Sequence, residues 1–350
     1  MTRIALRSVL LLGFCALLAA CGGTKRSSGT TSGVAGAQKT LASLEVGLVT
    51  DIGGLNDRSF NHLAYVGLQR AESRLHVQGR ALTSSSNADY VPNLSSLARQ
   101  NYDLVIAVGF LMADAVSTVA KKFPQTHFAI IDLPVEALKG KPENVVGLVF
   151  KQEQGGYLAG YLAGLIQKQA GFPRSKPQQV VGAVGGQKIP PVVSYIAGYR
   201  AGAKAADPQA KVLIQYSNDF VDQAKCKEIT LNQIAASADA IIQLAGGCGL
   251  GVLDAAREKG VWGIGADADQ SYLGAHILTS ALKKVDVSVF DTVKSVGNGS
   301  FKGGTDSVFD VANGGVGIGK ISPQVPKALV AKVMAVKAKL AKNAIKVPTT

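Results

Sequence analysis

The feature that most constrains the fold of this 350-residue chain is an alternation of short β-branched runs with longer amphipathic segments. Strands are expected at 45–50, 104–108, 128–132, 145–149, 180–184, 211–216, 240–244 and 262–266. Helices are expected between them, at 60–75, 90–100, 114–123, 155–170, 191–206, 221–236 and 249–259. Apolar strands separated by helices are typical of parallel sheets covered on both faces. Eight such units exceed one mononucleotide-binding domain, so the pattern favours two doubly wound α/β lobes; a single eight-unit barrel is the alternative.

The first twenty residues have the pattern of a signal peptide. A basic start precedes the apolar run 9–20, which is too short to cross a bilayer comfortably. The run ends in Leu-Ala-Ala followed by Cys21, which resembles the bacterial lipobox, whose cysteine carries the lipid of the mature protein. We therefore expect lipidation at Cys21; an ordinary signal peptide is the alternative.

Residues 21–43 are rich in Gly, Ser and Thr and show no periodicity. Such a segment buries too little apolar surface to offset the entropy lost on ordering, so we predict a flexible tether. No later apolar run reaches membrane-spanning length. We expect an extracytoplasmic protein held by its lipid, at the outer face of the cytoplasmic membrane or in the periplasm.

Charge and motif content exclude several functions. The net charge is +13, but the 37 Lys and Arg residues are scattered and not interleaved with aromatics, so we expect no nucleic-acid partner. The four histidines lack metal-ligand spacing, and no nucleophile motif occurs. We expect neither an enzyme nor a metal or cofactor site.

Polar loops follow several expected strands. In open α/β sheets, ligands bind outside the carboxyl ends of the strands. Glycines there let the backbone approach a ligand, and carboxylates and amides supply hydrogen bonds. If two lobes face each other, these loops line one cleft; simple turns and helix caps are the alternative. The loops are DIGGLNDRSFN (51–61), GFLMADA (109–115), GGQKIPP (185–191), SNDF (217–220), AGGCGLG (245–251) and DADQ (267–270).

Two cysteines remain in the expected folded part. Cys226 lies in the helix after strand 211–216, and Cys248 lies just beyond strand 240–244. If those strands are parallel neighbours, both cysteines reach the same sheet edge, within bridging range. An extracytoplasmic compartment lets a disulfide persist, so we predict one; two separate buried thiols are the alternative.

An ordered series of motifs runs along the chain: DIGGLNDRSFN, GFLMADA, EQGGYLAGYLAG, GYRAG, NDF, GGCGLG, GADADQ and TSALKKVD. In this series the chain resembles the basic membrane protein family, substrate-binding lipoproteins of bacterial ABC importers, and is similar to the purine nucleoside receptor of spirochaetes. The resemblance covers about 44–286 and more weakly extends to 347.

The resemblance implies a type I periplasmic-binding fold, in which two lobes joined by three crossovers close over a ligand. By analogy, the first lobe comprises 44–149 with a return segment at 277–305. The second comprises 150–276 with the C-terminal part 306–350.

The resemblance also implies site residues. In nucleoside-binding members two aromatics sandwich the base, which corresponds here to Phe60 and Phe220. A carboxylate and a lysine hold the ribose, which corresponds to Asp267 and Lys283, and these two are expected to pair when the site is empty. Further candidates are Asp51, Asn61, Asp114, Gly246 and Gly247. Cys248 lies in the glycine-rich loop AGGCGLG (245–251), and a cysteine there departs from what we expect of the family.

The function implied is capture of a nucleoside, with a purine favoured, by a monomer that hands it to an ABC permease. A receptor for a sugar, an autoinducer or an amino acid on the same fold is one alternative. A regulatory or adhesive surface lipoprotein is another. A nucleoside hydrolase would need clustered aspartates for calcium, and DADQ supplies too few.

Overall fold

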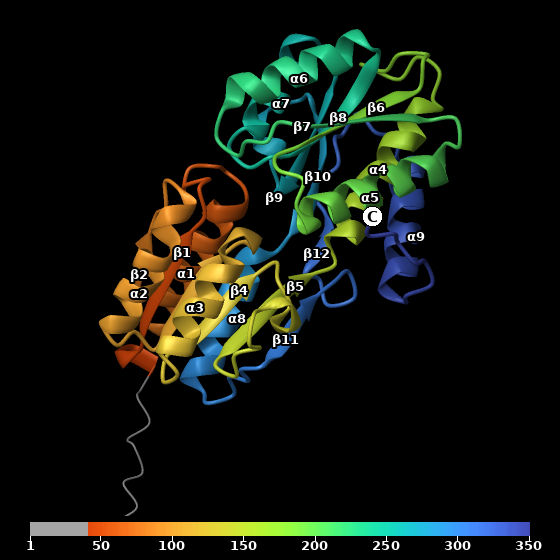
Figure 1. Cartoon of the computed structure of the whole chain (residues 1–350). Coiled ribbons are helices and arrows are strands. Elements are labelled where there is room, and N and C mark those ends of the chain that lie inside the picture. The colour runs from red at the N-terminus through yellow and green to blue at the C-terminus, as the bar shows by residue number, and fades with distance from the viewer. Residues whose placement is uncertain (1–40) are drawn as a thin grey trace, which may run out of the picture. The chain divides into compact units, whose positions relative to one another are not determined.

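The computed structural model describes residues 41–350 (Figure 1). The predictions of a signal peptide, of lipidation at Cys21 and of most of the tether lie outside the described residues. Two six-stranded sheets organise the described part, with strand orders β11-β5-β4-β3-β1-β2 and β12-β10-β9-β8-β6-β7. All pairings are parallel except that of β10 with β12. These are open sheets, so the two-lobe α/β prediction is confirmed and the barrel alternative is wrong.

The strands match the expected ones closely, with four additions: β2, β10, β11 and β12. The first sheet contains β1 (Glu45–Thr50), β2 (Gln78–Leu82), β3 (Leu104–Val108), β4 (His127–Ile131), β5 (Val145–Phe150) and β11 (Thr305–Phe309). The second contains β6 (Val180–Gly185), β7 (Lys211–Tyr216), β8 (Ala238–Leu244), β9 (Trp262–Asp267), β10 (Ile277–Lys283) and β12 (Val316–Ile318).

Helices cover both faces of the first sheet and with it form the first lobe. Helices α1 (Phe60–Leu75) and α8 (Val285–Gly297) pack together on one face, and α2 (Tyr90–Arg99) and α3 (Ala113–Lys122) on the other. Successive strand side chains point to opposite faces. Leu48 therefore packs in the core between the sheet and helices α1 and α8. Its neighbour Val49 packs in the core on the other face, under α2 and α3.

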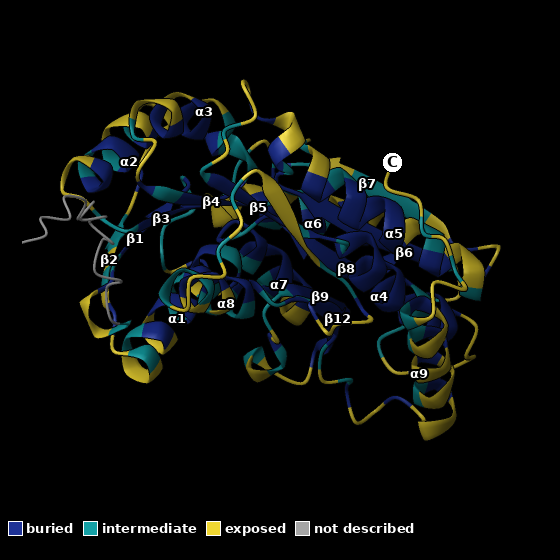
Figure 2. Ribbon diagram, turned by 90° about the horizontal axis from the view of Figure 1, so that it is seen from below, coloured by how far each residue is buried: buried dark blue, intermediate teal, exposed yellow. Residues whose placement is uncertain are grey.

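The second lobe repeats this arrangement. Helices α4 (Gln152–Gln167) and α5 (Pro190–Ala206) cover one face of the second sheet, and α9 (Lys327–Ala341) packs on α4. Helices α6 (Gln223–Ala235) and α7 (Gly249–Glu258) lie together on the other face. Figure 2 shows α4 in the colour of buried residues, whereas α9 carries an exposed outer surface.

The chain passes between the lobes three times: after β5, between β10 and α8, and between β11 and β12. Two expected boundaries are therefore displaced. β10 pairs with β9 in the second sheet, although 277–305 was expected in the first lobe. β11 pairs with β5 in the first sheet, although 306–350 was expected in the second lobe. The rest of the predicted division stays a prediction.

Short 3-10 helices complete the described chain, at Leu41–Ser43, Asn87–Asp89, Phe110–Met112, Val135–Ala137 and Ser271–Leu273. No helix within residues 41–350 is long and apolar enough to cross a membrane.

Candidate ligand-binding site

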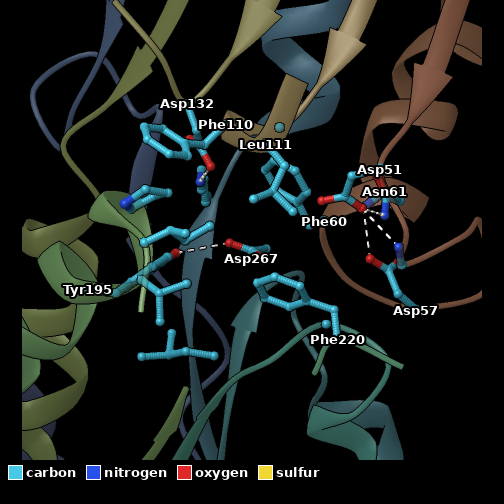
Figure 3. Close-up of a pocket in the computed structure, with 18 residues that line it drawn as sticks. Asp51, Asp57, Phe60, Asn61, Phe110, Leu111, Asp132, Tyr195, Phe220 and Asp267 are labelled. Carbon is cyan, nitrogen blue, oxygen red and sulfur yellow. Dashed lines mark hydrogen bonds and ion pairs between the residues drawn. The ribbon is translucent and has the colours of Figure 1, made fainter. Parts of the chain in front are cut away.

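A pocket lies between the two lobes, where strands of both sheets end (Figure 3). It encloses about 620 Å³ of space between atoms, including a part open to solvent. Its lining residues are Asp51, Gly53, Asp57, Phe60, Asn61, Gly109, Phe110, Leu111, Asp132, Ile189, Pro191, Val192, Tyr195, Phe220, Leu244, Gly246, Asp267 and Lys283.

Two phenylalanines from opposite lobes line the pocket. Phe60 is the first residue of α1, and Phe220 belongs to the loop after β7. Both are half-buried, and Figure 3 shows both rings directed toward the cavity. Gly186 leaves room for one of them, because a Cβ there would lie 2.3 Å from the Phe220 ring. Two flat apolar surfaces are thus available to a ligand.

The first lobe contributes a buried acid and amide. The Asn61 Nδ2 donates to Oδ1 of Asp51 at 2.6 Å, and the Gly53 N–H donates to the same oxygen at 3.0 Å. Burial raises the pKa of Asp51. The Oδ1 of Asn61 is buried and accepts no hydrogen bond from residues 41–350, so it is open to a ligand donor. Gly109, at φ +119°, is needed here because a Cβ would lie 3.1 Å from Oδ2 of Asp51.

Asp57 holds the start of α1 in place. Its carboxylate accepts backbone N–H bonds from Ser59 at 3.0 Å, Asn61 at 2.9 Å and His62 at 3.0 Å. The N–H groups of Asn61 and His62 are donors that the first helical turn leaves without partners, so Asp57 caps the helix from just before its N-cap residue and orients Phe60 and Asn61. Burial raises the pKa of Asp57 to about 6.

Lys283 pairs with Asp132, not with Asp267 as expected. Its Nζ lies 2.5 Å from Oδ2 of Asp132, and both side chains are almost fully buried. Asp132 follows β4 and carries a second oxygen that is buried and accepts no hydrogen bond from the described residues. Lys283 also lies 4.8 Å from the centre of the Phe60 ring, within cation–π range.

Asp267 is held by hydroxyl groups instead. The Ser59 Oγ lies 2.9 Å from its Oδ2, and the Tyr195 Oη lies 3.3 Å from its Oδ1. These contacts explain why the expected Asp267–Lys283 pair is replaced: Asp267 already has donors, whereas Asp132 has only the lysine. Burial raises the pKa of Asp267, and the charge of Lys283 opposes that rise.

Hydrogen bonds at the pocket connect the two lobes. Ser59, before α1, reaches Asp267 and also lies 3.0 Å from the carbonyl oxygen of Ala266 in β9. The Gln270 Nε2 donates to the carbonyl oxygen of Arg58 at 3.3 Å. The lobes are in contact around the cavity, which is the arrangement of a closed cleft.

The structure brings seven of the nine ligand-site candidates to the pocket wall: Asp51, Phe60, Asn61, Phe220, Gly246, Asp267 and Lys283. Gly247 lies just behind it; a Cβ there would lie 3.3 Å from the carbonyl oxygen of Phe220. Asp114 is a correction. Its side chain is 82% exposed on α3 and pairs with Lys139 at 2.9 Å, because α3 turns that position away from the cavity. Phe110 and Leu111 of the same loop line the pocket in its place.

Sequence reasoning missed several lining residues. Asp132 ends the expected strand 128–132, so the strand-end rule could have identified it. Asp57 lies inside the loop 51–61, where the sequence alone does not separate a helix cap from a pocket residue. Tyr195 sits within α5, where no local signal separates a pocket residue from a core residue.

The structure joins Cys226 and Cys248 in a disulfide, with their Cα atoms 5.5 Å apart. The expected reason was wrong, since β6 lies between β7 and β8 in the sheet. The adjacent helices α6 and α7 bring the two cysteines together. No group of residues within 41–350 has the composition and spacing to hold a metal ion.

Comparisons with known proteins identify the family of the chain. The profile of the Bmp family, described as ABC transporter substrate-binding protein PnrA-like, matches residues 44–350. The chain belongs to the Bmp family. The resemblance to the basic membrane proteins is thereby confirmed, as is the expectation of a substrate-binding protein and not an enzyme.

Two relatives of this Bmp-family chain are similar over most of its length. The "ABC transporter nucleoside-binding protein BmpA" of Lactococcus lactis is 34% identical, with 91% of each chain covered. The "CD4+ T-cell-stimulating antigen" of Listeria innocua is 34% identical, with 95% of this chain and 94% of the relative covered. An ABC transporter solute-binding protein from Aeropyrum pernix has the same fold, with a TM-score of 0.80 at 24% identity over 88% of this chain and 94% of that one.

Proposed function

We propose that this Bmp-family protein captures a nucleoside, preferably a purine nucleoside, outside the cytoplasm and delivers it to an ABC permease. The observation that carries the proposal is the pair of rings, Phe60 and Phe220, that approach one cavity from opposite lobes. Stacking of a base on an aromatic side chain contributes roughly 1–3 kcal/mol per ring. The nucleoside-binding relative from Lactococcus supports the same ligand class.

The polar end of the pocket fits a sugar that donates hydrogen bonds. Asp267, the free oxygen of Asp132 and Oδ1 of Asn61 are acceptors, whereas Lys283 is a donor. Ribose hydroxyls both donate and accept, so they can meet both kinds of group. A ligand without hydroxyl or amino donors would leave the acceptors unsatisfied, which is costly in a buried site.

Calorimetry tests this proposal. Protein that has been unfolded and refolded to remove endogenous ligand is titrated with adenosine, guanosine, inosine, cytidine and uridine, and with ribose and adenine as controls. We expect purine nucleosides to bind most tightly and the two fragments to bind far more weakly, because each engages only half of the site. Absence of heat with all five nucleosides would exclude the nucleoside assignment; binding of ribose alone would favour a sugar receptor.

We also propose that the protein is a monomer anchored through a lipid on Cys21. The Leu-Ala-Ala-Cys sequence and the tether composition of 21–43 support this anchor. Cys21→Ala should move the protein from the membrane fraction to the soluble fraction, as measured by fractionation and immunoblotting. Ser27→Ala, within the same predicted tether, is the control and should stay with membranes. Retention of the Cys21→Ala variant would contradict the anchor.

A further inference from the structure

The loop that carries Phe220, residues 217–222, connects β7 to α6 at the border of the second sheet. β7 is an edge strand, so this loop has a sheet neighbour on one side only. Two backbone bonds anchor its start: the Ser217 N–H to Gly185 O at 2.9 Å and the Asn218 N–H to Gly186 O at 3.0 Å. The side chain of Asp219 then accepts hydrogen bonds from the N–H groups of Val221 and Asp222 within the loop, and its other oxygen lies 3.9 Å from the Lys225 Nζ in the first turn of α6.

The hydrogen bonds at the far end of the loop are mostly local, because the Asp222 side chain accepts from the N–H groups of Ala224 and Lys225 at 2.9 and 3.3 Å. Every residue from 221 to 225 is exposed, and Cys226 is the first fully buried side chain after Phe220. One backbone bond joins this region to the glycine loop, from the Cys248 N–H to the Phe220 carbonyl oxygen at 3.1 Å. The disulfide between Cys226 and Cys248 lies directly beside that bond.

The same disulfide also holds the glycine loop (residues 245–251), because Cys248 lies within it. Gly246 lines the pocket two residues before Cys248, and a Cβ at Gly246 would lie 3.4 Å from Phe220 O. The starts of α6 and α7 approach closely, since a Cβ on Gly251 would lie 1.9 Å from the carbonyl oxygen of Gln223. One covalent bond therefore fixes the position of the Phe220 loop relative to the glycine loop, and both loops line the pocket.

We propose that the Cys226–Cys248 disulfide positions the part of the pocket lining formed by Phe220 and Gly246. It thereby sets ligand affinity, in addition to stabilising the lobe. The role in affinity rests on the proposed nucleoside function. A ring held in place before binding loses little freedom when the ligand arrives, whereas a ring on a loose loop must be ordered at the expense of affinity. Cys226 and Cys248 are positioning residues, because they act through Phe220 and the glycine loop.

The test compares Cys226→Ala/Cys248→Ala with the wild-type chain and with Leu340→Ala. Leu340 is buried in α9, which packs on α4, and lies outside the pocket lining, so its truncation lowers stability without touching the wall. We expect the double variant to bind the wild-type protein's best nucleoside at least tenfold more weakly, chiefly through faster dissociation. Leu340→Ala should bind within twofold of wild type.

A second readout needs no ligand. Hydrogen exchange measured by mass spectrometry should be at least tenfold faster in peptides covering 217–225 of the double variant, with no change in peptides covering 104–112. If the double variant fails to fold, Cys226→Val/Cys248→Ala, which refills part of the volume, takes its place. Unchanged exchange in 217–225 overturns the inference, and so does unchanged affinity in a variant that is measurably less stable. A wild-type protein that binds no nucleoside contradicts the proposed function and leaves the exchange result to decide the positioning role.

Discussion

At the scale of single residues, Lys283 determines the charge balance of the pocket. It is the only lysine or arginine among the lining residues that the structure describes, and it shares the cavity with four aspartates, among them Asp132 and Asp267. Its ammonium binds Asp132 and offsets part of the rise in the pKa of Asp267. A ligand that reaches Lys283 therefore competes with an existing buried ion pair, and it must supply hydrogen bonds comparable to those it displaces.

The substitution Phe220→Ala tests whether Phe220 contributes to ligand binding or to the stability of the core. Phe220 is half-buried, borders the cavity and packs on the core with one side only, so its truncation should lower the free energy of unfolding by much less than loss of a fully buried phenylalanine. Nucleoside affinity should fall by roughly 1–3 kcal/mol, the value of one stacking contact. Calorimetry and urea unfolding measure the two quantities. If the variant instead loses roughly 3–5 kcal/mol of stability, Phe220 belongs to the core.

At the scale of elements, the close contact of α4 with α5 depends on glycines. A Cβ on Gly160 would lie 2.0 Å from the carbonyl oxygen of Tyr199, and one on Gly198 would lie 2.0 Å from the carbonyl oxygen of Glu153. Side chains at these positions would force apart two helices that cover one face of the second sheet.

Gly160→Ala should therefore destabilise the protein, although alanine has the higher helix propensity. Overpacking of a tight contact costs typically 1–3 kcal/mol, which exceeds the gain of about 1 kcal/mol in propensity. Gly317→Ala is the matched control, because its Cβ would meet only the Lys337 Nζ, at 3.9 Å. Urea unfolding should show a lower midpoint for Gly160→Ala alone; equal midpoints would show that the helices can separate freely.

The cap of α1 predicts a pH dependence. Burial raises the pKa of Asp57 from 3.8 to about 6, so the folded state binds this proton more tightly than the unfolded state. Its contribution to the free energy of unfolding is therefore largest below pH 4 and falls as the pH rises toward 6, by on the order of 2–3 kcal/mol. Asp57→Asn keeps an acceptor for the helix but cannot ionise.

Unfolding by urea at pH 4.5 and pH 7.5 measures this effect. The loss of stability on going to the higher pH should be smaller in Asp57→Asn than in wild type. Asp239, whose pKa burial also raises to about 6, remains in both proteins and cancels from the comparison. An identical pH dependence in the two proteins would mean that Asp57 does not titrate in this range.

Most elements up to residue 267 could be read from the sequence because hydrophobic strands and amphipathic helices are local features, whereas β2, β10, β11, β12, α8 and α9 were not predicted. The pocket loops followed because strand ends mark the binding edge of such sheets. Tyr195 and the Lys283–Asp132 pair could not be read, since each joins segments more than 70 residues apart whose meeting depends on the lobe geometry. The lobe boundaries given by analogy were wrong at β10 and β11 for the same reason: the local sequence does not state which of two sheets a segment joins.

At the scale of the whole molecule, closure of the cleft depends on a few bonds between the lobes. The Ser59 hydroxyl has one proton for two acceptors, Ala266 O at 3.0 Å and Asp267 Oδ2 at 2.9 Å. Ser59→Ala removes this link, so we expect a larger open population and weaker ligand binding, by roughly 1.5–3 kcal/mol for a hydrogen bond to a charged group. Small-angle X-ray scattering and calorimetry measure the two effects.

Ser73→Ala is the control for that variant. Ser73 also lies on the first lobe, but its hydroxyl donates only to the Arg70 carbonyl within α1. It should match wild type in both measurements. If Ser59→Ala also matches wild type, closure does not depend on this hydroxyl.

The three passages of the chain between lobes also dictate an order of assembly during export. A chain that emerges from a membrane pore with its N-terminus first presents β1 to β5 together with α1, α2 and α3, but α8 follows only after the whole of β6 to β10. Until then α1 alone covers its face of the first sheet, and the apolar side chains that contact Val285, Val289 and Val293 stay exposed to water. We therefore expect the first lobe to complete its core only when residue 297 has crossed.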